Sequence, residues 1–150
     1  MDIIIEKLKK EDLIEAIKIY DDNHEIESNI ELAQKRFDEL DKCPTIHNIV
    51  AKLDGEVVGF ATIIINYDIV AELKPFLTVW NVGVKKNKRR MGIATKMFEY
   101  IEDFSKENDY LFVSLVADKD NIGAQKFYES LGYEKHVGYF KMNEIEKEER

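Results

Sequence analysis

A strongly basic run stands between two segments of different periodicity. In Lys85–Arg90 five of six residues are cationic, and a glycine follows at Gly92. The residues before the run, Phe76–Val84, are typical of a strand, and Gly92–Lys106 after it has the apolar spacing of an amphipathic helix. The first N–H groups of a helix lack internal partners and lie at the positive end of the helix dipole, where anions bind. The pattern predicts a phosphate-binding site at this junction, with a solvated basic turn as the alternative.

Three cations and two small residues would serve such a site. Lys88, Arg89 and Arg90 can make charge-assisted contacts with a phosphate. Gly92 lets the backbone turn sharply, and Ala94 keeps the first helical turn uncrowded. Neither Gly-x-x-x-x-Gly-Lys-Ser/Thr nor Gly-x-Gly-x-x-Gly occurs in the chain, so the P-loop and Rossmann types of nucleotide site are excluded.

The expected strand before the basic run contains a glycine, Gly83. A glycine inside a strand often marks a β-bulge or a close approach of another chain segment. A bulge would splay two neighbouring strands and leave backbone N–H and C=O groups unpaired. The alternative is that Gly83 only relieves packing.

A second segment combines a polar helix start with an aromatic pair. Asn121 can cap the short helix Ile122–Leu131, and Gly132 suits the left-handed position that ends it. The apolar residues of this helix fall at i, i+3, i+4 and i+7, namely Ala124, Phe127, Tyr128 and Leu131. By this spacing Tyr128 is a core aromatic, whereas by its chemistry the phenol can donate a proton to a leaving group.

The two segments resemble the two signatures of the GCN5-related N-acetyltransferases. Arg89-Arg90-Met91-Gly92-Ile93-Ala94 fits Arg/Gln-x-x-Gly-x-Gly/Ala, and the residues from Asn121 to Tyr133 fit Asn-x-x-Ala-x-x-Phe-Tyr-x-x-x-Gly-Phe/Tyr. The resemblance covers essentially the whole chain, because the order of expected elements is also that of the family. It implies an α+β acyl-CoA N-acyltransferase fold, with acetyl-CoA as the cosubstrate and no metal.

The resemblance also implies which residues bind acetyl-CoA. The pyrophosphate is expected on the backbone amides of Arg89, Arg90, Met91, Gly92, Ile93, Ala94 and Thr95. The peptide-like pantetheine arm is expected beside Val82, Gly83 and Val84, where a backbone N–H polarises the thioester carbonyl. Asn121, Ala124 and Tyr128 are expected to contact the cofactor as well. Tyr128 is also the expected general acid, which protonates the departing thiolate.

The base that accepts a proton from the attacking amine is not evident. An alkylammonium has a pKa near ~10, so a base or a water chain should remove that proton. Many relatives carry a Glu on the strand before the basic run, whereas no carboxylate lies between Phe76 and Val84. The alternatives are Glu72 and Asp68 before that strand, Glu25 and Glu27 between the first two helices, and an ordered water held by Asn81.

An acidic run, Asp21–Glu27, separates the first two expected helices, and the resemblance implies that this region lines the acceptor side. An acidic rim favours a cationic acceptor such as a polyamine, an aminoglycoside or a basic peptide end; a solvated loop is the alternative. The predicted function is direct acetyl transfer to a primary amine of a small cationic acceptor. The alternatives are a protein N-terminal acetyltransferase of the ribosomal-protein type and a non-catalytic acyl-CoA-binding relative. A homodimer is common in the family and is a further expectation.

The elements that must position these residues follow from periodicity and turn signals. Strands are expected at Ile3–Leu8, Ile46–Lys52, Val57–Asn66, Phe76–Val84 and Tyr110–Ala117, with one or two more in Tyr133–Met142; helices are expected at Lys10–Asp22, Asn29–Leu40, Gly92–Lys106 and Ile122–Leu131. Ser28 or Asn29 can cap the second helix, and Asp54-Gly55 predicts a tight hairpin. The order β-α-α-β-β-β-α-β-α-β-β predicts a mixed, mostly antiparallel sheet of six or seven strands with helices on both faces. The charged tail, Asn143–Arg150, is expected to fray.

Composition restricts the class of protein. The chain has 150 residues, 45% of them hydrophobic, which predicts a single domain over residues 1–150. A formal net charge of −8 argues against binding to nucleic acid, which requires a basic face. The chain has one cysteine, Cys43, no basic region at its start, and no apolar stretch approaching the ~20 residues of a membrane helix, so we expect a cytoplasmic protein. His24, His47 and His136 lie far apart in the sequence, so no metal site is predicted.

Overall fold

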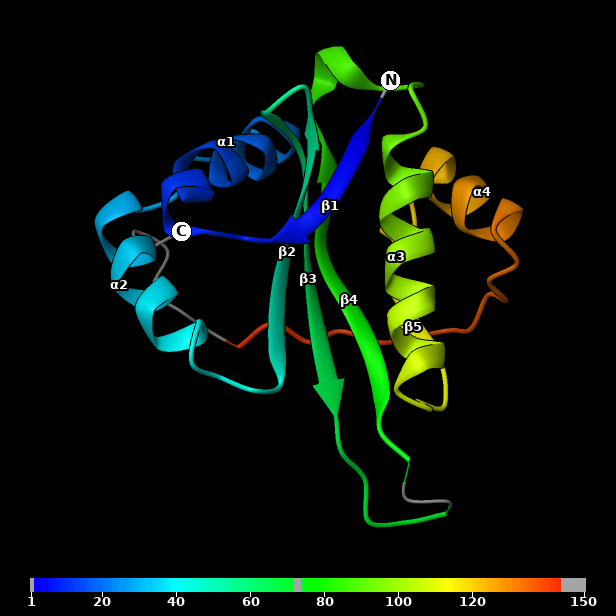
Figure 1. The fold of residues 1–150 in the computed structure, drawn as a ribbon. Coiled ribbons are helices and arrows are strands. Elements are labelled where there is room, and N and C mark those ends of the chain that lie inside the picture. The colour runs from blue at the N-terminus through cyan, green and yellow to red at the C-terminus, as the bar shows by residue number, and fades with distance from the viewer. Residues whose placement is uncertain (1, 72–73, 144–150) are drawn as a thin grey trace. The chain divides into compact units, whose positions relative to one another are not determined.

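The computed structural model describes residues 2–71 and 74–143, whose elements are labelled in Figure 1. The chain divides into two compact units. The first unit, residues 1–115, contains β1 (Ile3–Lys7), α1 (Leu13–His24), α2 (Ile30–Leu40), β2 (Ile46–Leu53), β3 (Glu56–Asn66), β4 (Phe76–Val84), α3 (Ile93–Glu107) and β5 (Val113–Leu115). Short 3₁₀ helices lie at Lys10–Asp12 and Lys86–Lys88. The second unit, residues 116–150, contains α4 (Ile122–Ser130). The predicted order of elements is confirmed as far as α4.

Five strands form one sheet in the order β1-β2-β3-β4-β5. The first four strands pair antiparallel, and β5 pairs parallel to β4 opposite Leu77, Thr78 and Val79. The parallel pair is the one whose strands are linked through a helix, α3, because such a connection returns the chain to the same end of the sheet. The mixed, mostly antiparallel sheet is therefore confirmed.

The hairpin between β2 and β3 forms where the sequence predicts it. Asp54 and Gly55 both have positive φ, 51° and 82°. Two such residues make a type I′ turn, whose twist matches that of the flanking strands. The turn fixes the register of β3, the strand against which the end of β4 is aligned.

Helices α1 and α2 lie on one face of the sheet and α3 lies on the other (Figure 1). On the first face the buried cluster consists of Leu8, Leu13, Ala16, Ile19, Val50 and Val57, with Ile17, Phe37 and Phe60 packed against it. On the second face α3 buries Ile93, Met97, Phe98 and Ile101. The prediction of helices on both faces of the sheet is thus confirmed within the first unit.

Helix α3 lies close to the sheet because Gly59 of β3 has no side chain. A Cβ at this position would stand 2.7 Å from Sδ of Met97 and 3.2 Å from Cβ of Ala51. Distances this short would force the neighbours apart. The glycine therefore lets α3 pack tightly, and this packing fixes the helix that follows the basic run.

The loop between α1 and α2 is held by its own side chains. Asn29 caps α2, because its Oδ1 accepts the N–H of Leu32 at 2.9 Å. Ser28 instead gives both its groups to Asp21, whose carboxylate accepts the Ser28 N–H at 2.8 Å and the Ser28 hydroxyl at 2.6 Å. Of the two caps left open by the sequence, Asn29 is therefore the correct one.

The predictions for the C-terminal strands need correction. The strand expected over Tyr110–Ala117 is confined to Val113–Leu115, and Tyr133–Met142 contains no strand. Val137 and Tyr139 of that segment are 76% and 92% exposed. The described residues thus form five strands rather than six or seven, because a β-prone run becomes a strand only where a neighbour completes its hydrogen bonds. Of the expected fraying tail, residues 144–150 lie outside the described residues.

The second unit is organised around α4, whose two ends form as predicted. Oδ1 of Asn121 accepts the N–H of Ala124 at 3.1 Å and caps the first turn. At the other end Gly132 has a φ of 92°, and the N–H of Tyr133 donates to the C=O of Tyr128 at 3.0 Å. This is the Schellman arrangement that a left-handed glycine forms after a helix.

Candidate active site

Strand β4 contains a β-bulge near its C-terminal end. Two of its residues, Asn81 and Val82, lie opposite the single residue Ala61 of β3. Asn81 has a φ of 58°, a left-handed conformation that asparagine tolerates better than most residues. The bulge that Gly83 suggested in the sequence therefore lies immediately before Gly83.

Beyond the bulge, the outer edge of β4 has no partner strand within residues 2–71 and 74–115. Strand β5 pairs with β4 only as far as Val79. The N–H of Lys85 donates to the C=O of Val58 in β3 at 2.8 Å. Backbone groups of successive residues alternate between the two sides of a strand, so the N–H and C=O of Val84 point away from β3. The C=O of Val84 already accepts Nδ2 of Asn23 at 3.2 Å, so its N–H is the group of this residue that faces an extended ligand.

A chain of uncharged polar side chains holds the bulge. Nδ2 of Asn81 donates to Oγ1 of Thr62 at 3.2 Å, and the Thr62 hydroxyl donates to Oδ1 of Asn48 at 2.6 Å. Thr62 is only 7% exposed, so these bonds satisfy a buried hydroxyl and fix the orientation of Asn81. None of the three side chains carries a charge, so the chain positions the bulge without supplying a base.

After the bulge, β4 passes through the 3₁₀ turn Lys86–Lys88 into α3. Arg90 and Gly92 have positive φ, 64° and 80°, and turn the backbone so that the helix begins at Ile93. No side chain caps α3, and its first turn closes with the N–H of Lys96 on the C=O of Gly92 at 3.1 Å. The three preceding helical N–H groups, of residues 93–95, are the donors that a phosphate at this end of the helix would engage.

The cations of the basic run differ in their partners. Glu56 lies 3.0 Å from Nζ of Lys85 and 3.9 Å from Nζ of Lys88. The hydrogen bond from Lys85 holds the pKa of Glu56 below its ordinary value, so this carboxylate is ionised and partly compensates both lysines. Nη2 of Arg89 donates to Oδ1 of Asn23 at 2.8 Å, which leaves the other guanidinium donors for a phosphate.

The residues of the second signature all lie in the second unit. Asn121 caps α4 by accepting the N–H of Ala124 through its Oδ1. Tyr128 lies one helical turn after Ala124. The ring of Tyr128 packs against those of Phe127 and Tyr133, with centroids 5.7 and 6.3 Å apart. Burial raises the pKa of Tyr128 above its ordinary value, so the phenol stays protonated at neutral pH. A protonated phenol is the state that a general acid requires.

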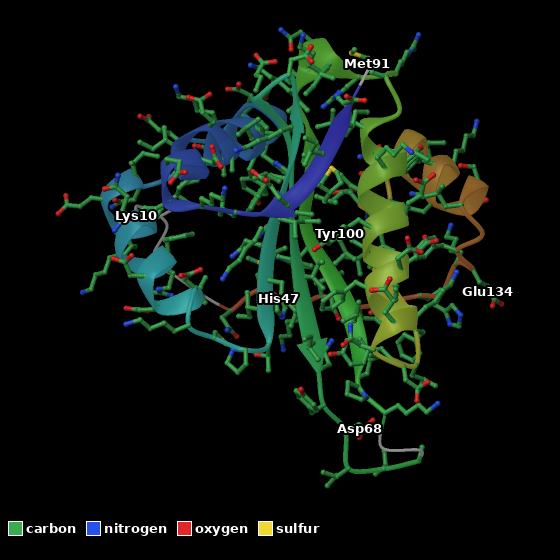
Figure 2. The ribbon with its side chains drawn as sticks, in the orientation of Figure 1. Lys10, His47, Asp68, Met91, Tyr100 and Glu134 are labelled. Atoms are coloured by element: carbon green, nitrogen blue, oxygen red, sulfur yellow. The ribbon has the colours of Figure 1, made fainter. Side chains whose placement is uncertain are left out.

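Asp68 lies far from the bulge. It follows β3, and its Oδ1 accepts the N–H groups of Ile69 and Val70 at 2.7 and 3.2 Å. Figure 2 shows Asp68 and Met91, a residue of the basic-run turn, at opposite ends of the sheet. The strand from Phe76 to the bulge alone spans about 16 Å at about 3.3 Å per residue. Asp68 is therefore too distant to act as a base at the bulge.

The remaining carboxylate candidates lie in or near the loop between α1 and α2. Glu25 and Glu27 are exposed, as is Asp22 on the last turn of α1. Asp21 is the acid of this run that is bonded to Ser28. Glu72 lies outside the described residues. The acidic run thus presents three exposed carboxylates, and β4 itself supplies none.

Three residues around the site were not predicted from the sequence, namely Asn23, Asn48 and Thr62. Asn23 contacts the basic run, Thr62 contacts the bulge and Asn48 holds Thr62, in each case from another element, so no local pattern marks them. The predicted residues from Val82 to Thr95 lie on one continuous segment at the end of the sheet, whereas Asn121, Ala124 and Tyr128 share one helix.

Two other kinds of site are not found among the described residues. No three side chains of His, Cys, Asp or Glu come together in an arrangement that could hold a metal ion in residues 2–71 and 74–143. In the same ranges no helix has both the length and the apolar character needed to span a bilayer.

The chain belongs to the acetyltransferase (GNAT) family, whose sequence pattern it matches over residues 8–133. The matched region includes the bulged end of β4, the basic run, the start of α3 and the whole of α4. The family expected from the two signatures is thereby confirmed.

Two curated relatives are similar to part of the chain. The N-acetylaspartate synthetase of Xenopus tropicalis is 38% identical over 90 residues, which are 59% of this chain and 31% of that protein. The naa20 catalytic subunit of the N-terminal acetyltransferase B complex of Schizosaccharomyces pombe is 34% identical over 62 residues, 39% of this chain and 34% of that protein. The chain thus spans about a third of the length of these relatives.

Solved structures share the fold over nearly the whole chain. A transcriptional regulator from Bacillus halodurans has a TM-score of 0.87 at 21% identity, covering 95% of this chain and 99% of that one. An aminoglycoside acetyltransferase from an uncultured soil metagenomic sample has a TM-score of 0.80 at 26% identity, covering 95% and 97%. A protein from Clostridium acetobutylicum that is described as a predicted acetyltransferase, solved with acetyl-CoA, has a TM-score of 0.74 at 18% identity, covering 95% and 96%. The mixed α+β fold class is thereby confirmed.

Proposed function

We propose that the protein is an acetyl-CoA-dependent N-acetyltransferase that transfers the acetyl group directly to a primary amine of a small cationic acceptor. The observation that carries the proposal is one continuous segment: the bulged end of β4 leads through the basic run into the uncapped start of α3. Beyond Val79 the outer edge of this strand has no partner strand among the described residues of the first unit. An extended, peptide-like arm that ends in phosphates fits this order of backbone groups, cations and helix N–H groups. Membership of the GNAT family supports the same function.

Acetyl-CoA, when bound, supplies a reactive thioester and a thiolate leaving group. The residues of this chain fit it at two places. The pyrophosphate is received by the backbone of Arg89–Thr95 and by the side chains of Arg89 and Arg90. Apart from Gly92 itself and its two chain neighbours, no described atom lies within 4 Å of the point where a Cβ of Gly92 would stand, so the turn is open on that side. The backbone of Val82–Val84 lines the arm. Asn121 and Ala124 are proposed as further contacts of the cofactor.

In this proposal a backbone N–H of the bulge stabilises the developing negative charge, and Tyr128 protonates the leaving group. A backbone N–H at Asn81–Val82 donates to the carbonyl oxygen, where negative charge develops; one such donor contributes about 3 kcal/mol. Tyr128, kept neutral by the burial that raises its pKa, donates its proton to the sulfur. Because β4 carries no carboxylate, the proton of the amine passes to a water held by Asn81 or to Glu25 or Glu27 of the loop after α1.

The proposed acceptor is cationic because the loop between α1 and α2 is acidic. The exposed acidic residues there are Asp22, Glu25 and Glu27. Their combined negative charge attracts a positively charged acceptor. The similarity to an aminoglycoside acetyltransferase at 26% identity supports an acceptor with several amines.

Acetylation of a protein N-terminus is the second candidate. It is favoured by the 34% sequence identity to the naa20 catalytic subunit, which exceeds the 26% identity to the aminoglycoside acetyltransferase. The match to naa20, however, covers only 39% of this chain. An acyl-CoA-binding protein without chemistry is the third alternative, supported only by the missing carboxylate on β4.

Steady-state kinetics of the wild type and Tyr128→Phe test the proposal. We expect turnover with polyamines or aminoglycosides in a panel that also contains amino acids and basic peptides. In Tyr128→Phe we expect kcat to fall about 100-fold, the lower end for a general acid, with little change in KM for acetyl-CoA. An unchanged kcat contradicts the role of Tyr128. CoA binding without turnover on any amine contradicts the enzymatic function.

Three further expectations accompany the proposal. The family match extends across the boundary between the two units at residue 115, which supports a single acetyltransferase domain over residues 1–150. The homodimer and the cytoplasmic location stay predictions from the sequence.

A further inference from the structure

The last turn of α1 reaches the end of β4 and the basic run through one side chain. Nδ2 of Asn23 donates to the C=O of Val84 at 3.2 Å, and Oδ1 of Asn23 accepts from Nη2 of Arg89 at 2.8 Å. Val84 and Arg89 lie 61 and 66 residues away in the sequence. One amide thus joins α1 to both parts of the segment proposed to hold acetyl-CoA. We call this pair of hydrogen bonds the Asn23 bridge.

Gly83 makes room for the Asn23 bridge. A Cβ on Gly83 would stand 2.9 Å from Nδ2 of Asn23 and 3.6 Å from Cγ2 of Ile19. The first distance is shorter than a van der Waals contact, so any larger residue would displace Asn23. Gly83 is not among the glycines with positive φ. Its role is therefore to let α1 approach the strand, which is the packing alternative that the sequence left open.

We propose that Asn23 is a positioning residue that holds Arg89 ready for the pyrophosphate; this inference rests on the proposed function. Arg89 is exposed, and a free arginine side chain populates many rotamers, whose loss on binding weakens affinity. The Asn23 bridge orders the guanidinium before the cofactor binds. Because the guanidinium has five N–H donors and Asn23 uses one side of it, the remaining donors stay available for phosphate oxygens.

The same turn of α1 also fixes the start of the acidic loop. Asp21 holds Ser28 through two hydrogen bonds, two residues before the asparagine that holds Arg89. Asn23 touches no atom that reacts in the proposed transfer. Its substitution should therefore act on the affinity for the cofactor and leave the rate at saturation nearly unchanged.

The test is the affinity for CoA, measured by titration calorimetry, together with steady-state kinetics. For Asn23→Ala we expect the Kd for CoA and the KM for acetyl-CoA to rise about 10-fold, with kcat changed less than about 2-fold. The matched control is His24→Ala on the same turn, whose ring contacts Tyr20 rather than the basic run. In that control both constants should stay within about 2-fold of the wild type, which separates the bridge from general damage to the end of α1.

A double-mutant cycle identifies the partner through which Asn23 acts. In an Arg89→Ala background, Asn23→Ala should change the Kd for CoA less than about 2-fold, because the group that it positions is gone. In an Arg90→Ala background the 10-fold loss should persist, because no hydrogen bond joins Asn23 to Arg90.

The outcomes separate the two proposals. If the wild type binds CoA and Asn23→Ala binds it equally well or more tightly, the positioning role is wrong and the proposed function stands. If Asn23→Ala weakens binding as much without Arg89 as with it, Asn23 does not act through Arg89 and the inference is overturned. If the wild type does not bind CoA at all, the proposed function fails and the inference fails with it.

Discussion

Helices α2 and α3 begin in opposite ways. Before α2, Oδ1 of Asn29 accepts the N–H of Leu32 at 2.9 Å, and Glu31 in the first turn carries the negative charge that suits a helix start. Before α3 stands Gly92, no side chain caps the helix, and its first turn contains no acidic residue. Cations precede it instead.

Helix α3 therefore lacks the stabilisation that α2 has at its N-terminal end. A side-chain cap contributes about 1 kcal/mol and an acid in the first turn about 0.3–1 kcal/mol. Helix α3 lacks both and is held by its buried face, which includes Ile93, Met97 and Phe98. Because packing rather than capping stabilises α3, its terminal N–H groups can remain available for an anion.

The largest expected effect, on the affinity for CoA, comes from placing an acidic residue in the first turn of α3, as Glu31 is in α2. In Thr95→Glu a carboxylate would stand at the proposed pyrophosphate site, and like charges brought together cost several kcal/mol, so the Kd for CoA should rise about 100-fold. The same carboxylate favours the helix dipole, so Tm should rise by about 1–4 °C. Titration calorimetry and thermal unfolding measure the two effects.

The matched control for that variant removes the acid from α2. Glu31→Gln should lower Tm by about 1–4 °C and leave the Kd for CoA unchanged. Unaltered CoA binding in Thr95→Glu would mean that the start of α3 is not an anion site, and the comparison of the two helices would lose its functional meaning.

The next effect tests whether packing is what holds α3. Gly59→Ala would place a Cβ 2.7 Å from Sδ of Met97, and such overpacking costs about 1–3 kcal/mol of unfolding free energy. The control is Gly123→Ala in α4, where the nearest atom beyond the neighbouring residues and the backbone of the helix would be Oδ1 of Asn121, 3.8 Å away. There the helix propensity of alanine should stabilise the protein by about 0.5–1 kcal/mol. Chemical denaturation of both variants checks the opposite signs; two destabilised variants would contradict the packing argument.

A smaller effect concerns the cap of α2. Asn29→Ala removes the acceptor for the N–H of Leu32, so unfolding free energy should fall by about 1 kcal/mol and Tm by about 2–4 °C. Asn29→Asp keeps a carboxylate oxygen as cap and should restore stability. CoA binding should not change in either variant, and a loss of CoA affinity would show that α2 also contributes to the cofactor site.

The smallest effect concerns the partner of the two lysines before α3. Glu56→Gln removes the anion beside Lys85 and Lys88, so the Kd for CoA should fall about 2–3-fold at low salt and less at high salt. Lys85 lowers the pKa of Glu56 in the folded protein, so the pair stabilises the fold above the ordinary carboxyl pKa. That stabilisation disappears as pH falls through the lowered pKa. The Tm difference between wild type and variant should therefore vanish in acid, and weaker CoA binding in the variant would contradict this account.

Local features of the fold were predictable because each is decided by a few neighbouring residues. The turn at Asp54-Gly55 needs two residues that accept positive φ, and the sequence places such residues between two β-prone runs. The cap at Asn121 and the Schellman end at Gly132 likewise involve partners within one or two turns of α4. The basic run and the glycine before α3 belong to the same class.

Features that depend on distant partners were not predictable. The run Tyr133–Met142 is β-prone but forms no strand, and β5 is shorter than its apolar run suggests. No local pattern predicted that the bulge would include Asn81, or that the side chain packed against Gly83 would be that of Asn23. In each case the deciding contact joins residues far apart in the chain, which periodicity and turn chemistry do not report.

The sequence by itself determined the family, the order of elements through α4, and the basic run and glycine that precede α3, because local hydrogen bonding and charge decide these. Only the tertiary structure decided that β5 pairs with β4 no further than Val79, that two of the lysines are paired with Glu56, and that Asn23 reaches Arg89 across 66 residues. The physical reason is that these contacts exist only after the sheet and α1 have packed together.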